Sequence, residues 1–542
     1  MNISRRQFFI GGAAFASLGA FGGNRFILAA AGFKAGGKPR LRFGVLSDIH
    51  ILRIGAEEKM SGGGNNLTFR HALEWFRSQD VDAVVIAGDM ADKGMDENLM
   101  AVADAWYSVF PSDKYPDGRL VEKVFVTGNH DWIGYTYGGA AAKKYPDEAE
   151  RVKHILQKDM AGWWGKAFHE TYTPLYAKTI KGYTFIGSHW DRAQVGRACG
   201  GASFGLIADF MAKDGKKIDP SLPFFYVQHP HLKDTCYGPW AWGHDAGITT
   251  KTLSAYPNAI AFSGHSHYSL TDERTIWQGA FTSVGTGSLR YTGTPGGERK
   301  PNGFENTGAS DWRVAARKLM KMIGTGDCRQ GMLWSVYDDC ITVKRREFLS
   351  DLDIGEEWVM PLPAAEPRPF AFAEHAKRLR APEFPAGATV AVTEMNAKNR
   401  GGKSKDGKER VASLKKPSFK VTVPAVVSDD KARLFSLEFT ATTADGKSQT
   451  KLVLPEGFNH SLKHKKAQSR QVCYFRKDEL GAGDVTFTVT PMNCFGARGK
   501  PLITIFKRQL QNLSGARFCD QGARAKRING DSPPCSGAVS HG

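Results

Sequence analysis

Hydrophobic residues in the first half of the chain form short continuous runs separated by amphipathic stretches. The runs are typical of strands buried on both faces: LRFGVL at 41–46, VDAVVIA at 81–87, VEKVFVT at 121–127 and NAIAFS at 258–263. Between the first three runs, LTFRHALEWFRSQD and DENLMAVADAWYSVF have helical periodicity, with Phe69, Ala72, Leu73 and Phe76 on one face of the first helix. Alternating strands and helices predict α/β layers.

Later runs lack long helices between them and predict further strands: YTFIGSHW, PFFYVQHP, TIWQGAFTSVGTGS and GMLWSVYDDCITVKRREF. Beyond about Met360 the composition changes to a Pro- and Ala-rich stretch typical of a linker. Seven short alternating runs follow, from ATVAVTEM to PLITIFK, and they predict a small all-β sandwich that resembles fibronectin type III or immunoglobulin-like modules.

Four polar segments lie at the ends of the four buried runs, and they carry the chemistry of the chain. They are Asp48-Ile49-His50, Gly88-Asp89, Gly128-Asn129-His130-Asp131 and Gly264-His265-Ser266-His267. We expect them to gather at one edge of a sheet. Carboxylate, imidazole and amide oxygen together favour Mn, Fe or Zn over Ca or Mg. One such segment alone is more often turn chemistry, but four buried clusters without ligands would leave costly unpaired polar groups. The set therefore predicts a two-metal site.

The order D-x-H, G-D-x-x-D, G-N-H-D, a strand-end His and G-H-x-H resembles the calcineurin-like metallophosphoesterase family over about residues 41–288. The resemblance implies an α/β fold, a four-layer β-sandwich flanked by helices, whose second sheet contains the later strands. It also implies hydrolysis of phosphomonoesters or phosphodiesters with two divalent metal ions, Mn, Fe or Zn, bridged by a hydroxide nucleophile.

The resemblance further implies these metal ligands: Asp48, His50, Asp89, Asn129, His229, His265 and His267. Asp89 bridges the two ions in that arrangement, and His231 stays open as an alternative to His229. His130 is then the general acid, oriented by Asp131. Purple acid phosphatases have Gly and Tyr where His50 and Asp92 stand, so a ferric-tyrosinate site is not expected. Asp92 either supports the site or caps the helix that follows.

Four further residues are candidates for substrate contacts: Arg53, His189, His231 and Arg290. The two arginines suit a phosphate group. His189 ends a predicted strand, where a structural role for a buried histidine is the alternative.

The amino terminus predicts export. Ser4-Arg5-Arg6-Gln7-Phe8-Phe9-Ile10 resembles a twin-arginine signal, and an uncharged stretch and small residues at Ala29–Ala31 follow it. That stretch is shorter than the roughly 18–20 residues that span a bilayer, so we expect cleavage and a periplasmic or secreted protein without a transmembrane span. The expected division is a signal at 1–31, the metallophosphoesterase domain at 40–350, a linker at 351–385, the sandwich at 386–508 and a flexible tail at 509–542.

Eight cysteines suit an exported protein with disulfides. Sequential pairing is expected because Cys473–Cys494 and Cys519–Cys535 would each stay within one segment. Four free buried thiols in place of these two bridges are the alternative.

The 542 residues are 41% hydrophobic, enough for packed domains, and carry a net charge of +18. From Glu366 onward, 31 Lys and Arg against 16 Asp and Glu give a net charge of +15, so most of the net positive charge belongs to the last part. These charges predict either binding to an anionic envelope or polysaccharide or a solubilising surface. The first part has no basic stripe, so no specific nucleic acid partner is expected. Two functions remain: an exported phosphoesterase, or a non-catalytic phosphate- or envelope-binding protein on the same fold.

Overall fold

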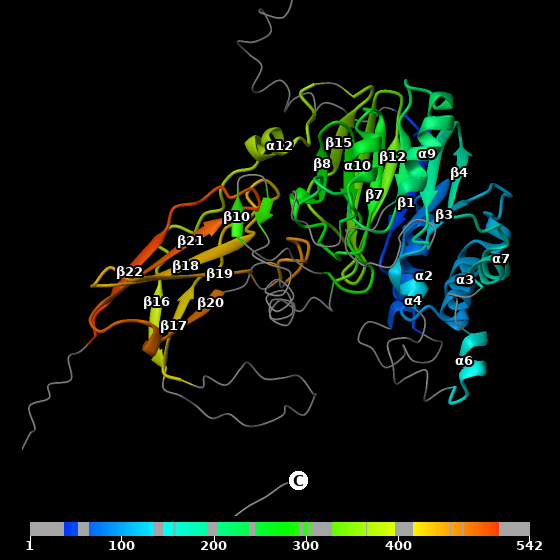
Figure 1. The fold of residues 1–542 in the computed structure, drawn as a ribbon. Helices are drawn as coiled ribbons and strands as arrows, with labels where there is room; N and C mark the ends of the chain where they lie inside the picture. The colour runs from blue at the N-terminus through cyan, green and yellow to red at the C-terminus, as the bar shows by residue number, and fades with distance from the viewer. Residues whose placement is uncertain are drawn as a thin grey trace, which may run out of the picture.

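The computed structural model describes residues 37–52, 64–133, 145–154, 159–191, 204–237, 244–292, 298–300, 303–305, 328–364, 366–395, 416–455, 457–465, 467 and 471–508. The predicted signal and tail lie outside these residues. Among the described residues, no helix is both long and apolar enough to cross a membrane. Figure 1 shows an α/β part, blue to green, and a β-rich part, yellow to red.

The first part contains two sheets and the helices that cover them. Its first sheet consists of β1 (Leu41–Leu46), β2 (Ala83–Ala87), β3 (Glu122–Val126), β12 (Gln330–Val336), β13 (Cys340–Glu347), β14 (Leu352–Asp353) and β15 (Trp358–Pro361). Its second sheet consists of β4 (Leu175–Ile180), β5 (Tyr183–Ser188), β6 (Phe224–Val227), β7 (Ala259–Ser263), β8 (Ile276–Gln278) and β9 (Thr282–Gly285). A separate hairpin pairs β10 (Glu298–Lys300) with β11 (Gly303–Glu305). The helices are α2 (Gly64–Ser78), α3 (Asp96–Val109), α4 (Asn129–Ile133), α6 (Glu148–Lys153), α7 (Met160–Phe168), α9 (Gly205–Asp214), α10 (Ile248–Leu253) and α12 (Phe372–Arg378).

These elements pack through apolar side chains into four layers. Helices α2, α3 and α7 cover the first sheet, and the predicted face of α2 is completely buried against it. Between the sheets, Phe43 of β1 contacts Phe185, Phe225 and Phe262 of the second sheet through edge-to-face ring pairs. Helices α9 and α10 cover the outer face of the second sheet. The predicted helix–sheet–sheet–helix architecture is confirmed.

Two strand placements differ from the prediction. The run NAIAFS, expected beside the first three strands, is β7 in the second sheet, where it pairs in parallel with β6 and β9. The run GMLWSVYDDCITVKRREF, expected in the second sheet, forms β12 and β13 in the first sheet, where β12 pairs with β1. Both runs are apolar enough to be buried on either sheet, so pairing partners rather than composition decide their place.

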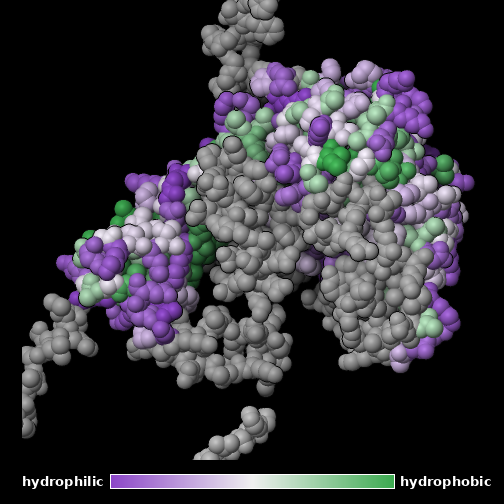
Figure 2. All heavy atoms as spheres, in the orientation of Figure 1, coloured by the Kyte–Doolittle hydropathy of each residue, from purple (hydrophilic) through white to green (hydrophobic). Residues whose placement is uncertain are grey.

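The last part contains the seven predicted strands in two antiparallel sheets. One sheet has the order β16 (Ala391–Met395), β17 (Ser418–Val423), β20 (Gln471–Arg476); the other has β19 (Ser448–Val453), β18 (Ser436–Thr443), β21 (Val485–Met492), β22 (Leu502–Phe506). Alternate side chains of β17, β18 and β21 point inward and share one core. The face shown in Figure 2 is largely hydrophilic over both parts, with hydrophobic residues in small groups.

The described cysteines do not form the expected bridge. Cys236, Cys328, Cys340, Cys473 and Cys494 are buried, and none of them is bridged to another described cysteine. The pairing of Cys473 with Cys494 was wrong, because Cys473 packs in the core of the last part and Cys494 belongs to a separate apolar cluster with Phe435. Cys519 and Cys535 lie outside the described residues.

Candidate metal centre

The four polar segments meet where β1, β2 and β3 of one sheet and β6 and β7 of the other end. Their backbone is unusual because five non-glycine residues have positive φ: Asp48 (50°), His50 (49°), Asp89 (52°), His265 (70°) and His267 (56°). Such conformations cost about 1–2 kcal/mol each. Backbone hydrogen bonds hold them, including Asp48 N to Gly88 O at 3.0 Å and His50 N to Asp89 O at 2.9 Å.

Glycine in these motifs makes room for the ligand-type side chains. Gly88 has φ of 89°, and a Cβ there would strike the imidazole ring of His229. At Gly264, a Cβ would lie 2.5 Å from Asp48 Oδ2 and 2.7 Å from Ser47 Oγ. The G-D and G-H-x-H spacings therefore reflect close packing of the site as well as turn conformation.

The first group of donors consists of Asp48, His50, Asp89 and His267, all buried. The Nε2 atoms of His50 and His267 are 3.2 Å apart. His267 Nε2 lies 3.0 Å from Asp48 Oδ1, and His50 Nε2 lies 3.5 Å from Asp89 Oδ2. Two imidazole nitrogens and two carboxylate oxygens thus converge on one point.

The second group shares Asp89 with the first. His229 Nε2 lies 3.2 Å from Asp89 Oδ2, 3.1 Å from Asn129 Oδ1 and 3.2 Å from His265 Nδ1. Of the two histidines left open by the sequence, the structure brings His229 to this group. All seven side chains expected as ligands therefore lie in two adjoining clusters.

Hydrogen bonds outside the clusters orient the donors. His229 Nδ1 donates to Ala87 O at 2.8 Å, and His267 Nδ1 donates to Tyr291 O at 3.0 Å, which leaves Nε2 of each ring directed at the cluster. In each of the two carboxylates, one oxygen accepts a backbone hydrogen bond. Asp89 Oδ1 accepts from His130 N at 2.8 Å, and Asp48 Oδ2 accepts from His265 N at 3.0 Å. The second oxygen of each carboxylate therefore faces the histidines.

The electrostatics of the clusters favour cations. Burial raises the pKa of Asp48 and Asp89, but His267 beside Asp48 and His229 beside Asp89 outweigh it and hold both pKa values below the usual range. Burial works against the protonated form of His50 and His229, yet the neighbouring carboxylates of Asp48 and Asp92 at His50, and the charge of Asp89 at His229, raise each pKa to about 9. Burial, with the charge of His229, lowers the pKa of His265 to about 3. The two carboxylates are thus ionised and attract positive charge.

Divalent transition metals fit this donor set. Asp48 Oδ1 is buried without a hydrogen bond from the described residues, although the Nε2 atoms of His267 and His50 lie 3.0 Å and 3.8 Å from it. Converging imidazole and carboxylate lone pairs repel one another unless a cation lies between them. Imidazole, carboxylate and amide oxygen are the ligands that Mn, Fe and Zn accept.

His130 and Asp131 are arranged differently from expectation. His130 Nδ1 donates to the carbonyl of Asp92 at 3.0 Å, so this carbonyl orients the imidazole. The carboxylate of Asp131 instead accepts from Ala91 N and Gly128 N, each at 2.7 Å, and burial raises its pKa to about 7. Asp131 fixes the turns that carry Asp89 and Asn129, and not the ring of His130.

Three residues line one side of the first donor group and form its border: Asp92, Arg290 and Tyr291. Asp92 is buried, lies 3.4 Å from His50 Nδ1 and binds the guanidinium of Arg290. It does not cap the next helix, because α3 begins at Asp96 with Met95 as its N-cap. The ring of Tyr291 lies 4.2 Å from that of His267. Tyr291 was missed from the sequence, and only its position six residues after the end of β9 at Gly285 could have suggested it.

The two other described candidates, His231 and His189, have partners outside the donor groups. Both ring nitrogens of His231 bond serine hydroxyls, Ser263 at 3.0 Å and Ser266 at 2.5 Å. His189 is enclosed by Trp164 and Tyr172, and its Nδ1 accepts from Thr127 N at 3.0 Å, which steadies the end of β3. Arg53 lies outside the described residues.

Comparisons with known proteins identify a family for residues 41–269. Residues 41–269 match the family model for the calcineurin-like phosphoesterases, which confirms the resemblance seen in the motifs. No curated protein matches the chain. Among solved structures, it is similar to a dimetal phosphatase from Danio rerio, at 14% identity over 60% of this chain and 100% of that chain, with a TM-score of 0.31. A purple acid phosphatase from yellow lupin (Lupinus luteus) seeds shows 13% identity over 59% of this chain and 53% of that chain, with a TM-score of 0.36.

Proposed function

Because residues 41–269 form a calcineurin-like phosphoesterase domain, we propose that the protein is an exported enzyme that hydrolyses phosphomonoesters or phosphodiesters with two bound transition-metal ions. The position of Asp89 Oδ2 carries the proposal. This oxygen lies 3.5 Å from His50 Nε2 and 3.2 Å from His229 Nε2, so one carboxylate atom faces both donor groups. A bridging ligand of a two-metal site needs this placement.

The chain's own residues have distinct tasks in this reaction. Asp48, His50 and His267 would hold one ion, and Asn129, His229 and His265 the other, with Asp89 between them. Once bound, the ions would polarise the phosphoryl oxygens and lower the pKa of a bound water.

His130 is the proposed general acid. Its Nδ1 proton is engaged by the carbonyl of Asp92 at 3.0 Å, so Nε2 is the nitrogen that passes a proton to the leaving oxygen. Burial, the strongest influence, lowers the pKa of this imidazole. A bound phosphoester dianion would favour the protonated form again, because opposite charges attract.

Arg290 is the proposed phosphate contact. Its side chain is 24% exposed and is held by the buried carboxylate of Asp92 at the border of the first donor group. A guanidinium fixed in this way can offer its remaining N–H groups to a phosphoryl oxygen. Asp92 then positions both Arg290 and His50.

A metal titration tests the proposed activity. Metal-free full-length protein would be titrated with Mn²⁺, Zn²⁺ and Mg²⁺ while turnover of p-nitrophenyl phosphate and bis(p-nitrophenyl) phosphate is followed. We expect turnover of at least one ester with Mn²⁺ or Zn²⁺, and the ratio of the two rates gives the ester preference. Two bound ions and retained phosphate binding without any turnover would favour the alternative, a non-catalytic phosphate-binding protein.

Export by the twin-arginine route is part of the proposal and is supported by the motif at Ser4–Ile10. We expect the mature protein to begin near Ala31 and to be found in the periplasm or medium, as amino-terminal sequencing would show. Replacing Arg5 and Arg6 together by lysine should retain the protein in the cytoplasm. Normal export of that variant would contradict the proposed route.

A further inference from the structure

A second group of metal-binding residue types lies away from the metal centre, between the two parts of the molecule. It consists of Cys328, Glu347 and His460, and one ligand atom of each lies within 4.8 Å of the others. Their side chains are 0%, 0% and 1% exposed. Neither the motifs nor the proposed phosphoesterase reaction makes use of them.

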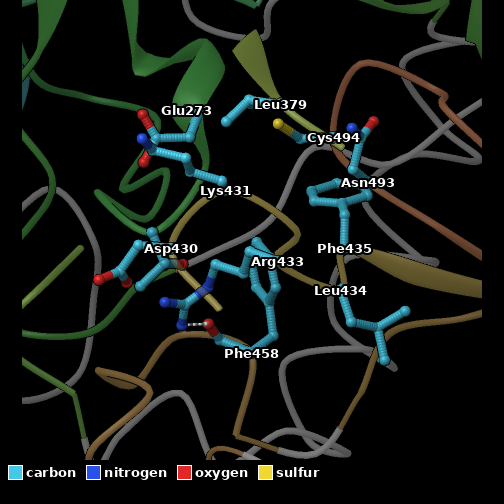
Figure 3. A pocket seen from close by; sticks show the side chains of 11 residues that line it. Glu273, Leu379, Asp430, Lys431, Arg433, Leu434, Phe435, Phe458, Asn493 and Cys494 are labelled. Carbon is cyan, nitrogen blue, oxygen red and sulfur yellow. Dashed lines mark hydrogen bonds between the residues drawn. The ribbon is translucent and has the colours of Figure 1, made fainter. Parts of the chain in front are cut away.

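Both parts of the molecule contribute to this group. Cys328 lies two residues before β12, and Glu347 ends β13, where it pairs with Gln330. These two donors therefore lie beside each other, one just before β12 and the other at the end of the neighbouring strand β13. His460 comes from the connection between β19 and β20 in the last part. The guanidinium of Arg433 holds that connection by donating to the carbonyls of Phe458, at 3.0 Å, and His460. Figure 3 shows the Arg433–Phe458 bond beside the pocket that lies along this boundary.

The contacts within the group are close. Glu347 Oε1 accepts from His460 Nδ1 at 2.8 Å, and Glu347 Oε2 accepts from Ser461 N at 2.9 Å. Cys328 Sγ lies 2.7 Å from the carbonyl oxygen of Asn459, which also accepts from Gln330 Nε2 at 2.7 Å. A thiol is a weak hydrogen-bond donor, so its contact with this carbonyl oxygen stabilises the buried sulfur only weakly.

Asn459 supplies a second, independent observation. It is 0% exposed, and both polar atoms of its side chain lack a hydrogen-bond partner among the described residues. A buried amide without hydrogen-bond partners lowers the free energy of unfolding, which means that it destabilises the folded protein. Its neighbour His460 and its own backbone oxygen both belong to the group, so a cation or its water shell bound there would offer the amide a partner.

We propose that Cys328, Glu347 and His460 bind one divalent transition-metal ion of the zinc class, which fastens the last part of the chain to the first sheet. Thiolate, imidazole and carboxylate are zinc ligands, and the fourth position of a tetrahedral site is left to Asn459 Oδ1 or to water. Cys328 forms the metal–sulfur bond as its thiol proton leaves to solvent. His460 would coordinate through Nδ1, the nitrogen that now donates to Glu347; the Nδ1 proton leaves to solvent, and the neutral ring then carries its proton on Nε2.

Cobalt substitution tests this site separately from the phosphoesterase centre. None of the seven donors at that centre contains sulfur, so a thiolate-to-cobalt charge-transfer band in the near ultraviolet reports only on a cysteine ligand. We expect the band in cobalt-loaded full-length protein and its loss in Cys328→Ser. Metal analysis should show one ion fewer per chain in that variant, while hydrolysis of a small aryl phosphoester is retained. The matched control is Cys340→Ser, a buried cysteine at the start of β13 outside the group, which should keep the band.

Two results would overturn the proposal. One is the absence of the band in folded, cobalt-loaded wild-type protein, which requires no variant to fold. The other is a band that survives Cys328→Ser, because another cysteine would then be the ligand. If Cys328→Ser does not fold, Glu347→Gln replaces it, and an unchanged number of bound ions in that variant would equally contradict the proposal.

Discussion

The two parts of the molecule end their strands in different ways. At the metal centre, five aspartates and histidines have positive φ, between 49° and 70°. In the described residues from 366 to 508, every residue with positive φ is glycine: Gly387, Gly446, Gly457, Gly483 and Gly496. Glycine adopts this conformation without strain, whereas other residues pay about 1–2 kcal/mol. Among the described residues, strained backbone of this kind therefore occurs only in the part that holds the proposed chemistry, and at the metal centre it aims ligand side chains at a shared point.

The largest effect is expected from replacing Asp89, the side chain that the two donor groups share. Asp89→Asn should abolish turnover and lower metal content, because a neutral amide is a poor bridge between two cations. Steady-state kinetics and metal analysis check both effects. The control is Asp82→Asn just before β2, since the side chain of Asp82 accepts from Arg42 N at 2.9 Å and pairs with Lys181, outside the metal centre. Full turnover in Asp89→Asn with both ions bound would exclude the bridging role.

The second-largest effect is expected at His130, and it distinguishes a general acid from a metal ligand. His130→Ala should reduce turnover by about 10²–10⁴-fold, the usual contribution of proton transfer, while metal content stays near wild type. A substrate with a very acidic leaving group should lose less, because it needs no proton. If the variant loses a metal ion, His130 is a ligand and our assignment of its role is incorrect.

Substitution of two glycines with similar φ, one in each part, allows a direct comparison of the two parts. Gly88 (φ 89°) lies against the ring of His229, whereas Gly446 (φ 81°) has nothing within 4 Å of a Cβ. Gly88→Ala should displace His229 and reduce turnover by about 10²-fold, as misplaced catalytic groups do. Gly446→Ala should cost about 1–2 kcal/mol of unfolding free energy and leave turnover intact. Kinetics and denaturant unfolding on both variants check this, and equal losses of turnover would remove the distinction between the parts.

The smallest expected effect concerns the positive charge of the last part. Replacing Lys463 and Lys465 by glutamine should leave turnover of a small ester unchanged but weaken binding to anionic vesicles, which salt should also weaken. Vesicle co-sedimentation at several salt concentrations is the measurement. Lys216→Gln with Lys217→Gln in the first part is the control. Unchanged binding in the Lys463 and Lys465 variant, or binding insensitive to salt, would favour the alternative of a purely solubilising surface.

Local pattern was sufficient to predict the strand ends, helices α2 and α3, and the family. The apolar face of α2 and the four motifs depend on residues close in sequence, so periodicity and spacing reveal them. The sheet to which β7 belongs could not be read in this way, because a strand buried on both faces carries no mark of its neighbours.

The contacts that orient the site were also beyond the sequence. Asp92 orients His130 through its backbone carbonyl, and every residue type has such a carbonyl. Tyr291 likewise supports His267 through its carbonyl oxygen. Cys328 and His460 are 132 residues apart and meet only because two folded parts pack together.

Anomalous diffraction from crystals of the manganese-loaded protein tests the central claim most directly. We predict two anomalous peaks roughly 3.5–4 Å apart. One should lie among Asp48, His50 and His267 and the other among Asn129, His229 and His265, with Asp89 between them. A single peak in an active, fully loaded crystal, or two peaks that Asp89 does not bridge, would contradict the two-metal account.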